Sequence, residues 1–111
     1  ITGGFVALVL ALDRLKQQGA IRTIPITDYV AATSVGIVQA TPLLDLAYEE
    51  DSQAEVDMNV VKTGRGKFIE VQGTAESEPF DRASLDALLA LADKGIADLV
   101  EKQKALVGGI L

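Results

Sequence analysis

A long amphipathic segment dominates the last third of the sequence. Its apolar residues recur at helical spacing, whereas most of its charged residues, such as Asp93 and Lys102, fall outside that stripe. The apolar positions are Leu85, Leu88, Leu89, Ala92, Ile96, Leu99, Val100 and Leu106. Asp81 is the predicted N-cap, and Gly108 and Gly109 mark the predicted end. The segment therefore predicts a helix that packs one face against the rest of the fold.

The remaining sequence predicts one further helix and four strands. Residues 5–15 are rich in Leu and Ala and apolar almost all round at their start, which is typical of a helix covered on several sides. Apolar and β-branched runs predict strands at residues 29–38, 43–48, 56–62 and 67–72, the last two joined as a hairpin through Gly64 and Gly66. The order helix, four strands, helix predicts an α+β fold, with residues 1–111 forming a single domain.

Glycines at two places in the sequence lead to predictions about packing. Gly3 and Gly4 stand before the first predicted helix, where close helix packing is favoured over contact with an anion at the helix N-terminus. Gly95 lies inside the last predicted helix and should cost about 1 kcal/mol relative to Ala, which packing of the apolar stripe can offset.

The composition removes several kinds of chemistry. The 111 residues include no cysteine and no histidine, which excludes disulfides, Cys/His zinc sites, thiol nucleophiles and Ser/His triads. Catalysis would therefore depend on carboxylates, hydroxyls, amines or a bound hard cation. The longest apolar run, residues 5–12, is far shorter than the roughly 20 residues needed to cross a bilayer, so we expect no membrane partner and a cytoplasmic location. The chain begins with Ile1, which suggests a piece of a longer polypeptide.

An acidic stretch is the one constellation that could perform chemistry. Asp45, Glu49, Glu50, Asp51, Glu55 and Asp57 fall where no Lys or Arg occurs between Arg22 and Lys62. If Asp51 and Asp57 converge, their oxygens suit Mg²⁺ or Mn²⁺, which commonly keep waters that a substrate phosphate can replace. The other interpretation is a solvated loop whose acids face water, and spacing alone favours it.

Several motifs in register resemble the bacterial ribonuclease PH family of phosphorolytic 3′-to-5′ exoribonucleases. The matching runs are Val35-Gly36-Ile37-Val38, Asp45-Leu46, Tyr48-Glu49-Glu50-Asp51-Ser52, Ala54-Glu55-Val56-Asp57-Met58-Asn59-Val60-Val61 and Ile69-Glu70-Val71-Gln72-Gly73-Thr74-Ala75-Glu76. The resemblance extends from Ile1-Thr2-Gly3-Gly4 through the last helix and looks like the C-terminal half of that subunit. It implies a ribonuclease PH-type domain, ribosomal protein S5 domain 2-like, with a mixed sheet packed on helices.

The resemblance also implies an activity and a site. The family removes nucleotides from the 3′ end of precursor tRNA, with inorganic phosphate as co-substrate, and releases nucleoside diphosphates. Its two active-site aspartates correspond here to Asp51 and Asp57, which are the expected catalytic residues and the expected ligands of Mg²⁺ or Mn²⁺. The phosphate-binding residues are expected upstream of Ile1. The cation and positive side chains would screen the two anions that phosphorolysis brings together.

The expected partners are RNA and further copies of the same subunit. The resemblance implies a homo-oligomeric ring of six, a trimer of dimers with RNA entering a central channel. The net charge of −6 argues that the basic RNA-binding surface lies on the missing half or on neighbouring subunits. There are two alternative functions. One is a non-catalytic RNA-binding subunit of an exosome-like ring, against which the presence of both aspartates argues. The other is an isolated acidic cation-binding module, which ranks last.

Overall fold

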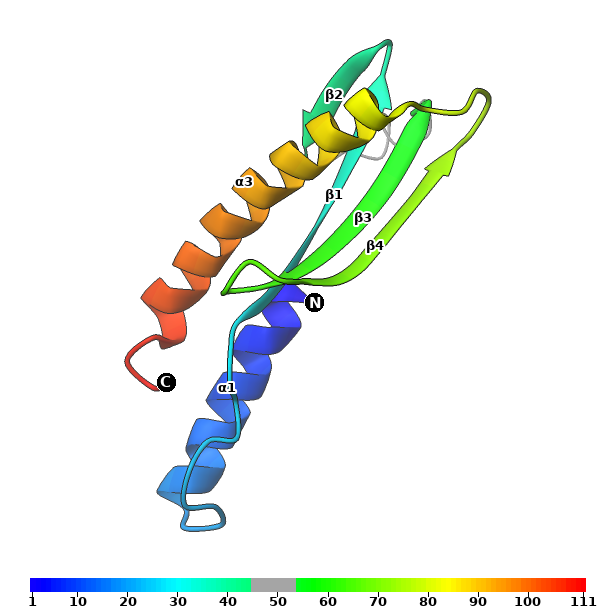
Figure 1. Cartoon of the computed structure of the whole chain (residues 1–111). Coiled ribbons are helices and arrows are strands. Elements are labelled where there is room, and N and C mark those ends of the chain that lie inside the picture. The colour runs from blue at the N-terminus through cyan, green and yellow to red at the C-terminus, as the bar shows by residue number, and fades with distance from the viewer. Residues whose placement is uncertain (45–53) are drawn as a thin grey trace.

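The computed structural model describes residues 1–44 and 54–111, and these residues form two helices and four strands (Figure 1). The elements are α1 (Thr2–Gln17), β1 (Val30–Val38), β2 (Thr41–Leu44), β3 (Val56–Thr63), β4 (Phe68–Ala75) and α3 (Arg82–Val107). The predicted α+β class and element order are confirmed. The strand predicted over residues 43–48 begins earlier, at Thr41, and its positions from 45 onward lie outside the described residues.

The strands form one sheet in the order β2-β1-β3-β4. All three neighbouring pairs are antiparallel, so the mixed sheet expected from the family resemblance is wrong for the described strands. Short connections explain the pairs β1–β2 and β3–β4, because a parallel neighbour needs a long crossover. Gln39 and Ala40 join β1 to β2 with positive φ angles of 51° and 63°, and Gly66, with φ 83°, reverses the chain between β3 and β4.

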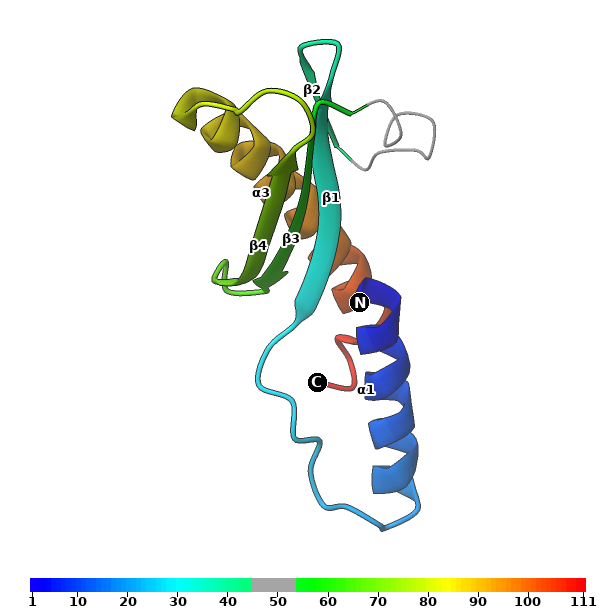
Figure 2. The ribbon, with the colours of Figure 1, turned by 90° about the vertical axis from the view of Figure 1, so that its right-hand side faces the viewer.

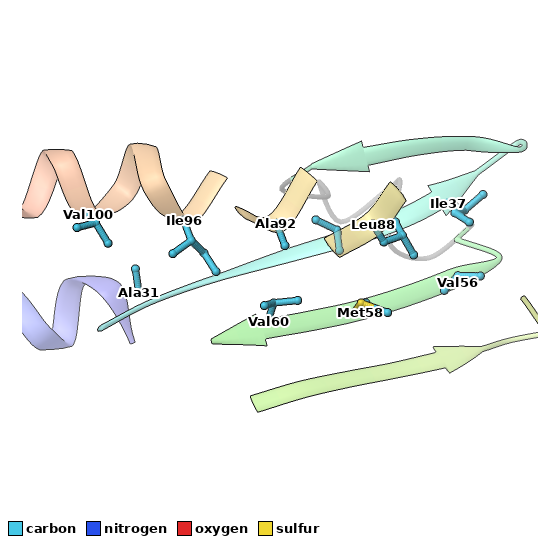
Figure 3. Close-up of a cluster of buried hydrophobic side chains, with 10 residues drawn as sticks. Ala31, Ile37, Val56, Met58, Val60, Leu88, Ala92, Ile96 and Val100 are labelled. Atoms are coloured by element: carbon cyan, nitrogen blue, oxygen red, sulfur yellow. The ribbon is translucent and has the colours of Figure 1, made fainter. Parts of the chain in front are cut away.

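One face of the sheet packs against α3 (Figures 1 and 3). Alternate residues of the two central strands point to this face, and Val35, Met58 and Val60 are almost completely buried there. Leu88 and Ala92 of α3 fill the other side of the same core. The predicted apolar stripe on the last helix is therefore confirmed as the face that packs on the sheet, except at Leu106, which is 70% exposed. The helical turn there buries the neighbouring Val107 instead.

Gly95 has a packing role that its helix propensity does not reveal. A Cβ atom at this position would lie 2.7 Å from Leu44 Cδ1 and 3.1 Å from Leu44 Cδ2. The absence of a side chain thus lets β2 approach α3 closely, which is the packing gain that offsets the poor helix propensity of glycine.

The predicted start of α3 is also confirmed. The Asp81 carboxylate accepts a hydrogen bond from the Ser84 backbone N–H at 2.8 Å, the geometry of an N-cap. This hydrogen bond to Ser84 lowers the pKa of Asp81 below its ordinary value. Neither described helix is both long enough and apolar enough to cross a membrane.

The N-terminal helix α1 extends beyond the end of the sheet, and the segment that follows it runs back beside it toward β1 (Figure 2). A second small core of Phe5, Val9 and Val107 joins α1 to the end of α3. The close packing expected at Gly3 and Gly4 is wrong, because a Cβ at either position would meet no atom within 4 Å in the described structure. Gly3 and Gly4 lie on the exposed side of the first helical turn, away from the contacts that Thr2 and Phe5 make with the rest of the described chain.

The described structure is elongated and leaves apolar side chains uncovered. Its radius of gyration is 16.7 Å, whereas a compact domain of this length has one of about 13 Å. Leu8 and Leu10 of α1 are each 51% exposed. An apolar helix of this kind is normally covered by more protein than these residues supply.

Candidate functional site

Asp57 lies on strand β3, near the end of the sheet where this strand begins. Successive side chains of β3 point to opposite faces of the sheet. Val56 and Met58 therefore point into the core beneath α3, and Asp57 points to the opposite face. Its neighbours in register are Gly36 on β1 and Thr74 on β4. A half-buried carboxylate is thus held on a central strand, beside a glycine that contributes no side chain.

The second predicted carboxylate, Asp51, lies outside the described residues. The convergence of Asp51 and Asp57 on one cation therefore stays a prediction. Among residues 1–44 and 54–111, no group of three or more Asp, Glu, His or Cys side chains is placed to hold a metal ion. The oxygen chemistry of Asp57 suits Mg²⁺ or Mn²⁺, but this part of the chain does not supply a complete ligand set.

A shallow depression lies on the same face of the sheet as Asp57. Its volume is about 420 Å³, and its polar lining includes Ser34 of β1, Asn59 of β3, and Glu70 and Gln72 of β4. Ile1, at the start of α1, forms part of its wall. The face of the sheet opposite α3 therefore carries both the predicted active-site carboxylate and a hollow of a size that can receive part of a ligand.

Two side chains hold the start of α1 beside this depression. The Thr2 hydroxyl lies 3.1 Å from the Ala32 backbone N–H, which donates to it, and 3.3 Å from the Ala32 carbonyl oxygen. The buried Gln103 amide donates to the carbonyl oxygens of Thr2 at 3.2 Å and Val30 at 2.8 Å. Together these contacts join α1, β1 and α3, so the wall of the depression is fixed to the sheet.

The nearest lysine along β3, Lys62, points to the face of the sheet that packs against α3. Lys62 is buried, forms an ion pair with Asp93 of α3, and lies 4.7 Å from the ring centroid of Phe68. Its charge is therefore balanced within the fold. It stabilises the contact between the β3–β4 hairpin and α3 and does not serve as a phosphate ligand on the Asp57 face.

The sequence analysis did not identify Ser34, Asn59 and Gln72 as site residues. A signal was present, because Asp57 and Asn59 are two residues apart on one predicted strand and so share a face. The partners across the strands could not be read from the sequence, since register depends on which strands become neighbours. The structure supplies that register.

Comparisons with known proteins place this arrangement in a family. Residues 28–95, from just before β1 to the middle of α3, match the model of the 3′ exoribonuclease family, domain 2. The chain is 63% identical over 108 residues to ribonuclease PH of Syntrophomonas wolfei, an alignment that covers 97% of this chain and 45% of that protein.

Two further relatives agree with this match. Ribonuclease PH of Bacillus pumilus is 59% identical and that of Bacillus subtilis 54% identical, and each alignment covers 100% of this chain and 46% of the relative. The chain thus spans slightly less than half the length of the curated relatives it matches. It belongs to the 3′ exoribonuclease family, of which it carries domain 2.

Proposed function

We propose that the protein carrying this chain is a phosphate-dependent 3′-to-5′ exoribonuclease that trims the 3′ end of precursor tRNA. The observation that carries the proposal is the similarity of the whole chain to ribonuclease PH from several bacteria, 63% identical in one of them. The position of Asp57 is consistent with it, because this carboxylate stands on a rigid strand and on the face of the sheet opposite α3.

In the proposed reaction, an oxygen of inorganic phosphate attacks the phosphorus of the last phosphodiester. The bond from phosphorus to the 3′ oxygen of the preceding nucleotide breaks, releasing a nucleoside diphosphate and an RNA shorter by one nucleotide. The leaving 3′ oxygen takes up a proton. Asp57, together with Asp51, would hold a Mg²⁺ or Mn²⁺ ion, which neutralises charge as the two anionic reactants approach.

The remaining parts of the machinery belong to the rest of the polypeptide and to other subunits. Nucleic-acid backbones are bound mainly by Lys and Arg, whereas this chain has a net charge of −6. Exposed apolar residues on α1, including Leu8 and Leu10, support coverage by further protein. We propose a homo-oligomer, a ring of six, with the phosphate ligands and the basic RNA surface outside these 111 residues. The lack of cysteine fits the proposed cytoplasmic location.

The test measures release of nucleoside diphosphates from an RNA 3′ end by the full-length protein. Release should require added phosphate, and Asp57→Ala should lower turnover by at least two orders of magnitude, since losing a ligand leaves the cation poorly held. Asp51→Ala should do the same. Asp98→Ala, which removes an exposed carboxylate of α3, is the matched control and should retain activity.

Two results would overturn this proposal. Wild-type turnover by Asp57→Ala would show that the site is assigned to the wrong carboxylate. RNA binding by the wild-type protein without any phosphate-dependent release would favour a non-catalytic ring subunit.

A further inference from the structure

Three polar side chains form a row across the face of the sheet opposite α3. Ser34 on β1 lies directly opposite Asn59 on β3, and Asn59 lies directly opposite Gln72 on β4. Side chains that oppose each other across antiparallel strands stand about 4.5–5.5 Å apart at their Cβ atoms. All three line the depression of about 420 Å³, and both amides are exposed. The row is thus a continuous hydrogen-bonding surface on rigid strands.

The chemistry of the depression selects the kind of group it can hold. Among the described residues that line it there is no Lys or Arg, and Glu70 adds a negative charge at its rim. These residues therefore supply no cationic ligand for a phosphate. No aromatic side chain lines it within the described chain either, so it offers no surface on which a base could stack. Two amides and a hydroxyl instead provide neutral donors and acceptors side by side, which suits the hydroxyl groups of a sugar.

The position of the row identifies which hydroxyl groups those are. Asn59 follows Asp57 by two residues on the same face of β3, a distance of about 7 Å along an antiparallel strand. In the proposed function, Asp57 acts beside the 3′ oxygen that leaves. The 2′ hydroxyl of the same ribose is carried by the adjacent carbon, which makes it a partner that the row could reach from Asp57.

We propose that Ser34, Asn59 and Gln72 bind the 2′ hydroxyl of the ribose whose 3′ oxygen leaves, and that they thereby select RNA over DNA at the scissile end. This inference rests on the proposed function, because it takes the position of the reacting 3′ oxygen from Asp57. The 2′ hydroxyl is both a donor and an acceptor, and it is the group that distinguishes the two nucleic acids. The three side chains are positioning residues that set specificity.

The test compares two oligonucleotides bound by the full-length protein. One is all RNA, and the other carries a single 2′-deoxy sugar at the penultimate position. Binding is measured in phosphate-free buffer, in which phosphorolysis cannot proceed, and kcat/KM is then measured with phosphate. The wild-type protein should prefer the all-RNA oligonucleotide by roughly three- to tenfold, the value of one or two neutral hydrogen bonds.

Asn59→Ala and Gln72→Met should each abolish most of this preference and leave affinity for the 2′-deoxy oligonucleotide almost unchanged. A residue with only a structural role would weaken binding of both oligonucleotides equally. Gln17→Ala, at the far end of α1, is the matched control and should keep the wild-type ratio. Both substituted amides are exposed, so we expect the variants to fold.

The inference is overturned if the two variants keep the wild-type ratio of RNA to 2′-deoxy affinity, or if the wild-type protein shows no preference at all. Phosphate-dependent release can still be observed in either case, so the proposed function is tested separately. Conversely, an absence of that release refutes the proposed function, while the binding ratio still decides whether the row recognises the hydroxyl.

Discussion

Replacing Gln103 by methionine should weaken the junction that holds α1 against the sheet. Gln103 is 1% exposed, and its amide nitrogen donates to the carbonyl oxygens of Thr2 and Val30 at 3.2 and 2.8 Å. Methionine has nearly the same length and a similar helix propensity, so Gln103→Met removes the two hydrogen bonds with little change in volume. The two backbone carbonyls would then lose these donors.

The size of the effect follows from the hydrogen bonds and from one compensating term. Each lost hydrogen bond is worth about 0.5–1.5 kcal/mol, and both together about 1–3 kcal/mol. The other amide atom, Oε1, is buried and has no partner in the described structure, so removing it recovers about 1 kcal/mol. We therefore expect Gln103→Met to lower the free energy of unfolding by about 1 kcal/mol, within a range of about 0–2 kcal/mol.

Gln103→Glu tests the loss of the two donors in a side chain with nearly the same shape as glutamine. It removes the same two donors and places a buried carboxylate against two carbonyl oxygens, so it should destabilise more than Gln103→Met at neutral pH. Burial raises the pKa of such a carboxyl, and the protonated form is the one the site tolerates. The stability of this variant relative to Gln103→Met should therefore improve as the pH falls.

The measurement is equilibrium urea unfolding of the full-length variants, followed by circular dichroism. Gln17→Met, at an exposed helical position, is the control for the substitution itself and should be nearly neutral. If Gln103→Met is more stable than the wild-type protein, the two hydrogen bonds do not outweigh the cost of burying Oε1 without a partner, and the argument is refuted.

Four further substitutions test the packing around the site by the same unfolding measurement. Leu88→Ala should cost about 2–5 kcal/mol, because Leu88 is completely buried between α3 and the sheet; a smaller loss would show that the core collapses around the gap. Gly66→Ala should cost about 1–2 kcal/mol, since φ there is 83°, and a neutral result would mean that the hairpin can adopt another turn. Asp93→Ala should cost about 1–2 kcal/mol, because it leaves Lys62 buried without its carboxylate partner. The cost is smaller than for a fully buried ion pair, since Asp93 is 51% exposed. Lys62→Met, which removes the buried charge, should be better tolerated. Asp81→Ala should destabilise α3 at neutral pH, and it should remove the part of the acid-induced loss of stability that comes from Asp81. The hydrogen bond from Ser84 lowers the pKa of Asp81 below 3.8 in the folded state, so its contribution is present above that value and is lost as the pH falls through the folded pKa. Equal acid sensitivity in the wild type and Asp81→Ala would contradict this assignment.

The sequence was sufficient for the elements whose signals are local. The apolar stripe predicted α3, and Asp81 predicted its N-cap, because both depend on spacing along the chain. The Gly64–Gly66 segment predicted the hairpin for the same reason. By contrast, Gln39 and Ala40 turn the chain between β1 and β2 with positive φ, although neither is a typical residue for that conformation. The tertiary contacts of the two strands override the local preference at that turn.

Long-range contacts decided the features that spacing could not predict. Gly95 was expected to be a tolerated defect in a helix, and the structure shows that its missing side chain makes room for Leu44. Gly3 and Gly4 were expected to pack closely, and they are exposed. In both cases the outcome depends on which distant segment lies nearby, which no local pattern encodes.

The candidate site also combines features that the sequence predicts with features that only the tertiary structure shows. The sequence by itself determined the family and named Asp57 as a carboxylate on a strand, because side-chain chemistry and alternation are written along the chain. The pairing of Asp57 with Asp51 stays a prediction, since Asp51 lies outside the described residues. Only the tertiary structure decided that Ser34, Asn59 and Gln72 form one row beside Asp57. Asn59 and Gln72 share a hairpin, but Ser34 comes from a strand that no tight turn joins to β3, so only the backbone hydrogen bonds between these strands set its register.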